Sequence, residues 1–248
     1  MFVKKTKTMK QIFTLGLILL TSFKMMAQGA YDDLRVLYVE ESYEKCYKKA
    51  FKYIEGEESK RHALPYFFYA AVNYRLSQNS KYSEDYPSAA KDAISYAGKF
   101  VKKDKNGDYS DYDLKMRFFE ELKMDLAEQI ENYWTDGTEK GYKKVASILK
   151  KAQKLDPQDA GMALLRGIAE IKTGNKTEGK KLVFEGYDRV KTTGVDVAFA
   201  DLSASTQYFY RMALMNYSIT LPQALPMAKK MKSTNTNSTW IIKHSMTN

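Results

Sequence analysis

Apolar residues recur at helical spacing along most of the chain, and the alternating pattern of a strand appears nowhere in the sequence. The stretch 62–76 is apolar at almost every position, so we expect a helix there that is buried on several sides. Pro65 suits the first turn of that helix. The other predicted helical stretches are 30–57 (one or two helices), 87–101, 113–134, 142–155, 161–173, 177–190 and 197–220. The pattern predicts an all-α protein whose helices form antiparallel pairs.

Small residues mark the places where helices are expected to approach closely. Ala89, Ala93 and Ala97 recur every four residues and therefore share one helix face. A stripe of alanines on a helix lets a neighbouring helix pack near its backbone. We expect this stripe to face another helix and to tolerate no larger side chain.

The segment 142–190 carries the most specific pattern in the chain. It reads as the end of one helix, a turn with a proline, a second helix, a turn with a glycine and a third helix, and its marker residues are Ala152, Pro157, Gly167, Gly174, Gly179 and Gly186. Their spacing resembles that of tetratricopeptide (TPR) repeats, in which helix pairs stack into a solenoid. Arg166 and Glu170 stand where that family usually has apolar and aromatic residues. The resemblance implies an irregular, TPR-like array of helical hairpins (an α-solenoid) with roughly four to five helix pairs.

The first 27 residues have the composition of a secretory signal peptide. Lysines 4, 5, 7 and 10 precede a short apolar run at 11–20, and Ala27 is a small residue suited to cleavage. The pair Ala27-Gln28 resembles the signal-peptide ends of Bacteroidota envelope proteins. We therefore predict a signal peptide at 1–27, a TPR-like helical domain at 28–221 and a basic, disordered tail at 222–248. The expected location is periplasmic or otherwise exported, and the alternative is an uncleaved leader that serves as a membrane anchor.

The net charge of +10 belongs mainly to the two ends of the chain. Nine lysines lie in 1–27 and 222–248, which contain no acidic residue, and the remaining basic residues almost balance the 30 acidic ones. Such a body lacks the charge expected of a nucleic-acid-binding protein. We expect no nucleic-acid partner, and membrane association only through a partner or an uncleaved signal.

No catalytic, cofactor or metal-binding motif stands out. Cys46 and His62 could form a catalytic pair, but a buried structural thiol is the better interpretation of a lone cysteine. Histidine and cysteine are too few for a metal site, and the acid-rich string 104–113 lacks the glycine and glutamate of a calcium loop. We predict no enzyme activity and no cofactor. The alternative is a cell-envelope enzyme or enzyme accessory acting on cell-wall material, with carboxylates such as those of Glu120, Glu121 and Asp125.

Tyrosine is the most abundant candidate for molecular recognition, with 19 residues in the chain. Tyrosines that line helical faces usually fill cores, but they are also enriched at protein interfaces. We expect that some of them are exposed and bind a partner, and the candidates are Tyr66, Tyr69, Tyr74, Tyr208, Tyr210 and Tyr217. The function predicted from sequence is a non-enzymatic periplasmic scaffold or adaptor for a protein or peptide of the cell envelope. A carbohydrate-uptake lipoprotein is a weaker alternative, because the chain has no cysteine to carry a lipid at the predicted cleavage site.

Overall fold

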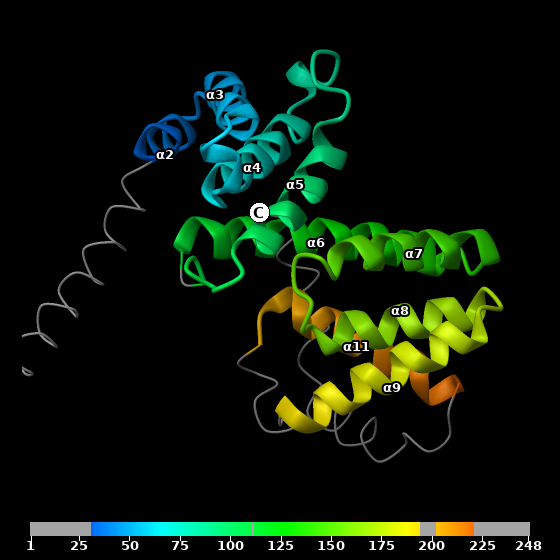
Figure 1. The fold of residues 1–248 in the computed structure, drawn as a ribbon. Helices are drawn as coiled ribbons and strands as arrows, with labels where there is room; N and C mark the ends of the chain where they lie inside the picture. The colour runs from blue at the N-terminus through cyan, green and yellow to red at the C-terminus, as the bar shows by residue number, and fades with distance from the viewer. Residues whose placement is uncertain (1–30, 111, 194–201, 221–248) are drawn as a thin grey trace, which may run out of the picture. The chain divides into compact units, whose positions relative to one another are not determined.

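The computed structural model describes residues 31–110, 112–193 and 202–220. These residues form nine α-helices and two short 3-10 helices, and they contain no strand, which confirms the predicted all-α class (Figure 1). The predicted signal peptide and tail lie outside the described residues. The chain divides into two compact units, Met1–Asp108 and Tyr109–Asn248.

Unit 1 is built around one central helix. Its helices are α2 (Asp32–Val39), α3 (Tyr43–Glu55), α4 (Leu64–Ser77) and α5 (Ala89–Lys103), with 3-10 turns at Ser59–Arg61 and Ser80–Tyr82. Helix α4 packs against α2, α3 and α5. Twelve of its 14 residues are buried, so the expectation of a helix covered on several sides is confirmed. The α4 sequence lacks a polar face, as expected for a helix that is covered on several sides.

Helices α2 and α5 show how local sequence sets the helix bounds. The predicted segment 30–57 forms two helices because Glu41, at φ 56°, reverses the chain between them. Helix α5 begins two residues after Pro87, and its alanines Ala89, Ala93 and Ala97 are buried where α5 packs on α4.

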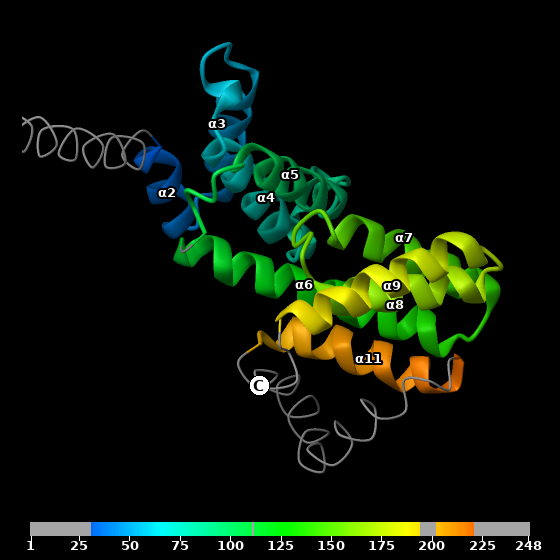
Figure 2. The same cartoon turned by 60° about the horizontal axis from the view of Figure 1, so that its bottom comes forward.

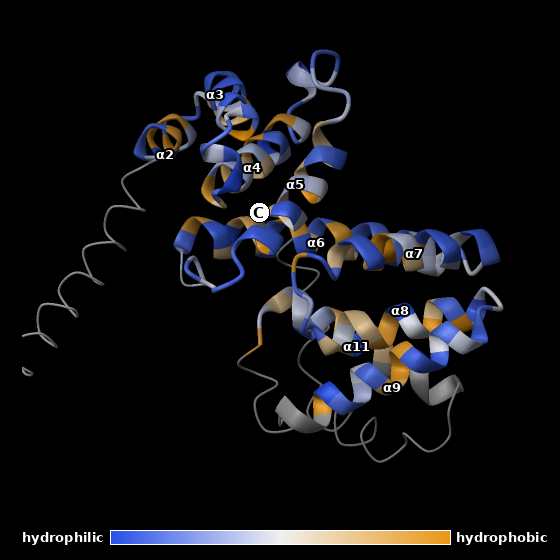
Figure 3. Ribbon diagram, viewed as in Figure 1, coloured by the Kyte–Doolittle hydropathy of each residue, from blue (hydrophilic) through white to orange (hydrophobic). Residues whose placement is uncertain are grey.

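Unit 2 contains α6 (Asp113–Thr135), α7 (Glu139–Ala152), α8 (Ala160–Lys172), α9 (Lys176–Thr193) and α11 (Ala204–Thr220). Consecutive helices α6–α7, α7–α8 and α8–α9 pack together, and the loops between them are short. Helix α8 lies at the centre, in contact with α7, α9 and α11, and Figure 2 shows it beside α9 and α11. Hydrophobic residues recur along α8, as the orange and pale segments of Figure 3 show.

Helix α11 does not extend the series of hairpins in unit 2. It packs back onto α8 and also contacts α6, which precedes it by about 70 residues in sequence. The packing of α11 therefore closes one side of the α6–α9 hairpins, a feature that the repeat-like sequence pattern did not predict.

Candidate functional site

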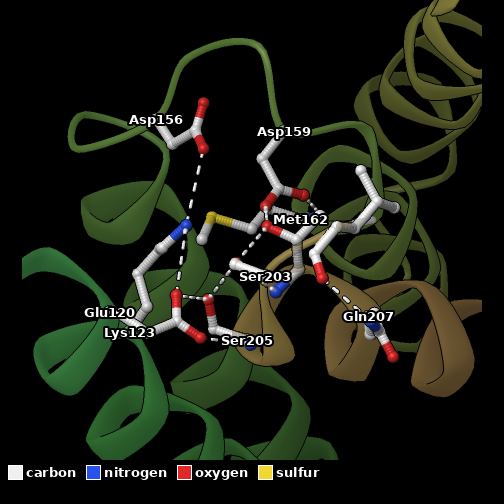
Figure 4. A network of polar contacts seen from close by, with 10 residues as sticks. Glu120, Lys123, Asp156, Asp159, Met162, Ser203, Ser205 and Gln207 are labelled. Atoms are coloured by element: carbon white, nitrogen blue, oxygen red, sulfur yellow. Dashed lines mark hydrogen bonds and ion pairs between the residues drawn. The ribbon is translucent and has the colours of Figure 1, made fainter. Parts of the chain in front are cut away.

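A network of buried and half-buried polar groups joins the first turn of α11 to α6 and α8 (Figure 4). Glu120 of α6 accepts two hydrogen bonds from Ser205, one from the backbone nitrogen and one from Oγ, each at 2.7 Å. Ser205 has no exposed surface. A carboxylate at a helix N-terminus satisfies backbone donors that lack partners in the helix and interacts favourably with the helix dipole. Glu120 therefore fixes the start of α11 on α6.

Asp159 makes a second connection of the same kind. Its Oδ1 accepts a hydrogen bond from the Met162 backbone nitrogen at 2.9 Å, which caps the N-terminus of α8. Its Oδ2 accepts a hydrogen bond from Thr206 Oγ1 of α11 at 3.0 Å. One carboxylate thus caps α8 and holds α11. Burial, with a smaller contribution from the nearby Asp156 carboxylate, raises the pKa of Asp159 to about 6 against the lowering effect of the Met162 hydrogen bond.

Lys123 places a positive charge among these carboxylates. Its side chain is only 9% exposed, and its Nζ lies 3.5 Å from Asp156 and 4.0 Å from Glu120. Figure 4 shows the Lys123 ammonium between the two acids. A buried lysine is costly unless it is paired, so this arrangement holds α6 close to the loop before α8. The contacts of this network order the ends of helices. The hydroxyl that donates to Glu120 belongs to Ser205, which is closed to solvent.

Replacing Asp159 with asparagine will change how stability depends on pH. The folded-state pKa of about 6 exceeds the ordinary value of 3.8, so the stabilisation from proton uptake is fully present below pH 3.8 and is lost as pH rises through about 6. Between pH about 7.5 and about 5, the free energy of unfolding of the unaltered protein should rise by roughly 1–1.5 kcal/mol relative to that of Asp159→Asn. Urea titrations of both proteins at the two pH values measure this difference, and a constant difference would contradict the assignment.

The residues considered for catalysis are not brought together. Cys46 is buried, with Sγ 3.6 Å from the Leu34 carbonyl oxygen, and burial raises the pKa of its thiol to about 12. His62 is exposed and its Nδ1 lies 2.6 Å from the hydroxyl of Tyr31, so Cys46 and His62 have different partners. Of the three α6 carboxylates considered for catalysis, that of Glu120 accepts its hydrogen bonds from Ser205. Within the described ranges, no group of three His, Cys, Asp or Glu side chains could hold a metal ion.

The tyrosines named as candidate partner-binding residues lie mostly in the two cores. Tyr66, Tyr69 and Tyr74 of α4 are all buried, although the sequence suggested that they could not all point inward. Helix α4 has neighbours on several sides, and rings on each of its faces are therefore covered. The buried candidates of α11 are Tyr208 and Tyr210, and the side chain of Tyr217 lies outside the described residues.

Exposed aromatic surface occurs instead beside these buried rings in unit 1. Rings of α3, α4, α5 and the loop before α5 form a continuous series, the aromatic band, which consists of Tyr47, Phe51, Tyr69, Tyr86 and Tyr96. Tyr69 is the buried centre of the band, with ring centroids 4.9 Å from Tyr47 and 4.5 Å from Tyr96. Phe51 is 41% exposed, and Tyr47, Tyr86 and Tyr96 are half-buried.

The aromatic band is held in place by polar contacts at its edges. The Tyr69 hydroxyl donates to the Tyr47 hydroxyl at 3.0 Å, and the Lys99 ammonium lies 3.7 Å from the centroid of the Tyr96 ring. Sequence patterns pointed to the tyrosines of α4 and missed Phe51. Its signal was present, because Phe51 lies off the buried face that Cys46, Ala50 and Ile54 form on α3.

The predicted packing residues of unit 2 lie at helix crossings and turns. A Cβ on Gly167 would lie 2.7 Å from the Gly179 carbonyl oxygen, and one on Gly179 would lie 2.7 Å from the Gly167 carbonyl oxygen. These two glycines therefore face each other where α8 crosses α9. An added Cβ on Gly186 would meet Leu164, and Gly174 lies in a turn at φ +85°. Ala152 is buried. Pro157 is exposed, and its carbonyl oxygen accepts a hydrogen bond from Arg189.

Two packing features of α8 could not be recognised from the repeat pattern. Gly161 allows α11 to cross closely, since a Cβ there would lie 2.7 Å from the Tyr210 backbone nitrogen. Arg166, one of the departures from the family pattern, donates to Gln153 Oε1 at 2.8 Å and lies 3.6 Å from Glu178. Glu170, the other departure, lies 3.9 Å from Arg166. The two departures form an ion pair at the junction of α7, α8 and α9.

Comparisons with known proteins do not place the chain in a family. Among the described residues, no helix combines the length and apolar character needed to cross a bilayer. No protein-family model matches the sequence, and neither a curated protein nor a solved structure shows significant similarity to it.

Proposed function

We propose that this chain is a non-enzymatic, exported scaffold that binds a protein or peptide of the cell envelope through unit 1. The basic, apolar and small residues of 1–27 support export. The consecutive hairpins of unit 2 and the close contact of Gly167 with Gly179 support an irregular, TPR-like arrangement. The cell envelope is the compartment in which such an exported protein meets its partner.

The aromatic band is the observation that carries the binding proposal. Phe51 presents a large apolar side chain to solvent. The half-buried rings of Tyr47, Tyr86 and Tyr96, which are linked to it through Tyr69 and Tyr47, combine apolar faces with hydroxyl groups. Aromatic residues supply much of the energy of protein interfaces because they bury a large area with few rotatable bonds. Three helices fix the rings through contacts with Tyr69, so a partner would lose little free energy in ordering them.

Site-specific crosslinking tests this function directly. With a photoreactive phenylalanine analogue in place of Phe51, we expect one dominant crosslinked species in cells, identifiable by mass spectrometry. The same analogue at Lys180, an exposed position of α9 in unit 2, serves as the control and should give no such species. Substituting Tyr96 with alanine should weaken the Phe51 crosslink severalfold, because Tyr96 supports the ring of Tyr69 at the centre of the band. Equal labelling from Phe51 and Lys180 would argue against a binding surface on unit 1.

A further inference from the structure

Helix α7 of unit 2 concentrates positive charge on one side. Between Gly137 and Leu155 the chain has one acidic residue, Glu139, and six lysines, which are Lys140, Lys143, Lys144, Lys150, Lys151 and Lys154. All six are exposed. At about 100° per residue, the five lysines within α7 fall within about a third of the helix circumference, and Lys154 follows in the turn after Ala152; the set of six is called here the lysine face. In Figure 3 the blue of hydrophilic residues recurs along the length of α7.

The charge of the lysine face is only slightly compensated. Its one ion pair in the described part of the chain joins Lys143 to Glu139 at 2.6 Å. The opposite side of α7 carries the buried residues Val145, Leu149 and Ala152 and packs on α6 and α8. The lysine face therefore points away from the helices of unit 2 as a straight row about 16 Å long between Lys140 and Lys151, at about 1.5 Å per residue.

The chemistry of this face fits the headgroup plane of a membrane better than it fits a nucleic acid. The cations are all lysines, which act as point charges and lack the planar fork with which arginine binds bases and single phosphates. The only other residue within the lysine face is Ser147, so the face offers no aromatic ring on which a base could stack. Clusters of four to eight basic residues on one side of a helix bind anionic lipid surfaces, which require charge and no exact geometry.

We propose that the lysine face of α7 binds the anionic phospholipid headgroups of a bilayer surface. This contact lies outside the aromatic band and adds a direct route to the membrane, whereas the sequence suggested association only through a partner or an uncleaved signal. The scaffold would then contact the membrane through unit 2, whereas the proposed partner-binding surface belongs to unit 1. Because the attraction is electrostatic, it weakens as added salt shortens the screening length.

Vesicle co-sedimentation of the full chain tests this proposal. The vesicles contain equal parts of phosphatidylglycerol and phosphatidylcholine, and the comparison vesicles contain phosphatidylcholine alone. Lys144→Gln combined with Lys151→Gln should lower the partition coefficient onto the anionic vesicles by roughly 25-fold, at roughly 5-fold per lysine. The control is Lys45→Gln combined with Lys48→Gln, which removes the same charge from exposed positions of α3. It should change the partition coefficient by less than about twofold.

The lysines of the leader and tail are identical in all three proteins, so the differences between them report on α7 and α3 alone. A local measurement removes any remaining contribution of the leader: anionic vesicles should protect Lys144 and Lys151, but not Lys45 and Lys48, from acetylation. The proposal fails if both double variants lose binding equally, if α7 gains no protection, or if the protein binds neutral vesicles equally well. Binding to polyglutamate without binding to anionic vesicles would also overturn it and would assign the face to an acidic protein.

Discussion

Replacing Gly167 with leucine should lower the free energy of unfolding of unit 2 by about 3 kcal/mol, the upper end of the usual cost of overpacking. An added Cβ would lie 2.7 Å from the Gly179 carbonyl oxygen and 2.9 Å from the Val183 backbone nitrogen. Both are backbone atoms of α9, so no side-chain rotation can make room, and α9 must move away from α8. Alanine at the same position should still destabilise, although alanine favours a helix over glycine by about 1 kcal/mol.

Chemical denaturation, followed by circular dichroism, measures this effect. Thr177→Leu is the matched control, since Thr177 is exposed in the first turn of α9 and its replacement adds a leucine without a helix contact. We expect a change of no more than about 0.5 kcal/mol there, as at most surface positions. If Gly167→Ala is more stable than the unaltered protein, the gain in helix propensity outweighs any steric cost at the crossing. That result would contradict the close packing of α8 on α9.

Helical periodicity was sufficient to predict most helix bounds. The predicted stretch 113–134 corresponds to α6, and 161–173 corresponds to α8 to within one residue at each end. Where local signals competed, the prediction was less accurate. The stretch 142–155 was expected to be a helix, but α7 begins at Glu139, because Thr138 caps it by accepting a hydrogen bond from the Gly141 nitrogen. A threonine cap four residues before the predicted start at Tyr142 is easily overlooked.

Contacts between distant residues could not be predicted from spacing. The bonds from Ser205 to Glu120 join residues 85 positions apart, and no periodic pattern relates them. The same limit applies to the tyrosines of α4. Whether Tyr66 and Tyr74 are exposed depends on how many helices surround α4, and a single helix sequence carries no such information. The aromatic band likewise depends on three helices and a loop that meet in the folded chain.

Replacing Ala93 with glutamate should have an even larger effect and should unfold unit 1. Ala93 has no exposed surface, and it lies in the alanine stripe where α5 packs on α4. Glutamate would place a carboxylate of about four additional heavy atoms in this contact, with the steric cost of overpacking and the cost of desolvating a charge. The combined loss, on the order of 5 kcal/mol, is comparable to the whole stability of a small domain.

Ala90→Glu provides a matched control on the same helix. Ala90 is exposed, so the substitution adds the same charge and volume to α5 at a position that contacts solvent. Amide hydrogen exchange, measured by mass spectrometry, should show full loss of protection in α3, α4 and α5 for Ala93→Glu and native protection for Ala90→Glu. Native protection in both variants would mean that the alanine stripe does not face α4. Ala93 is buried and Ala90 is exposed. An equal loss of protection in both variants would therefore mean that α5 unfolds for a reason other than its packing on α4.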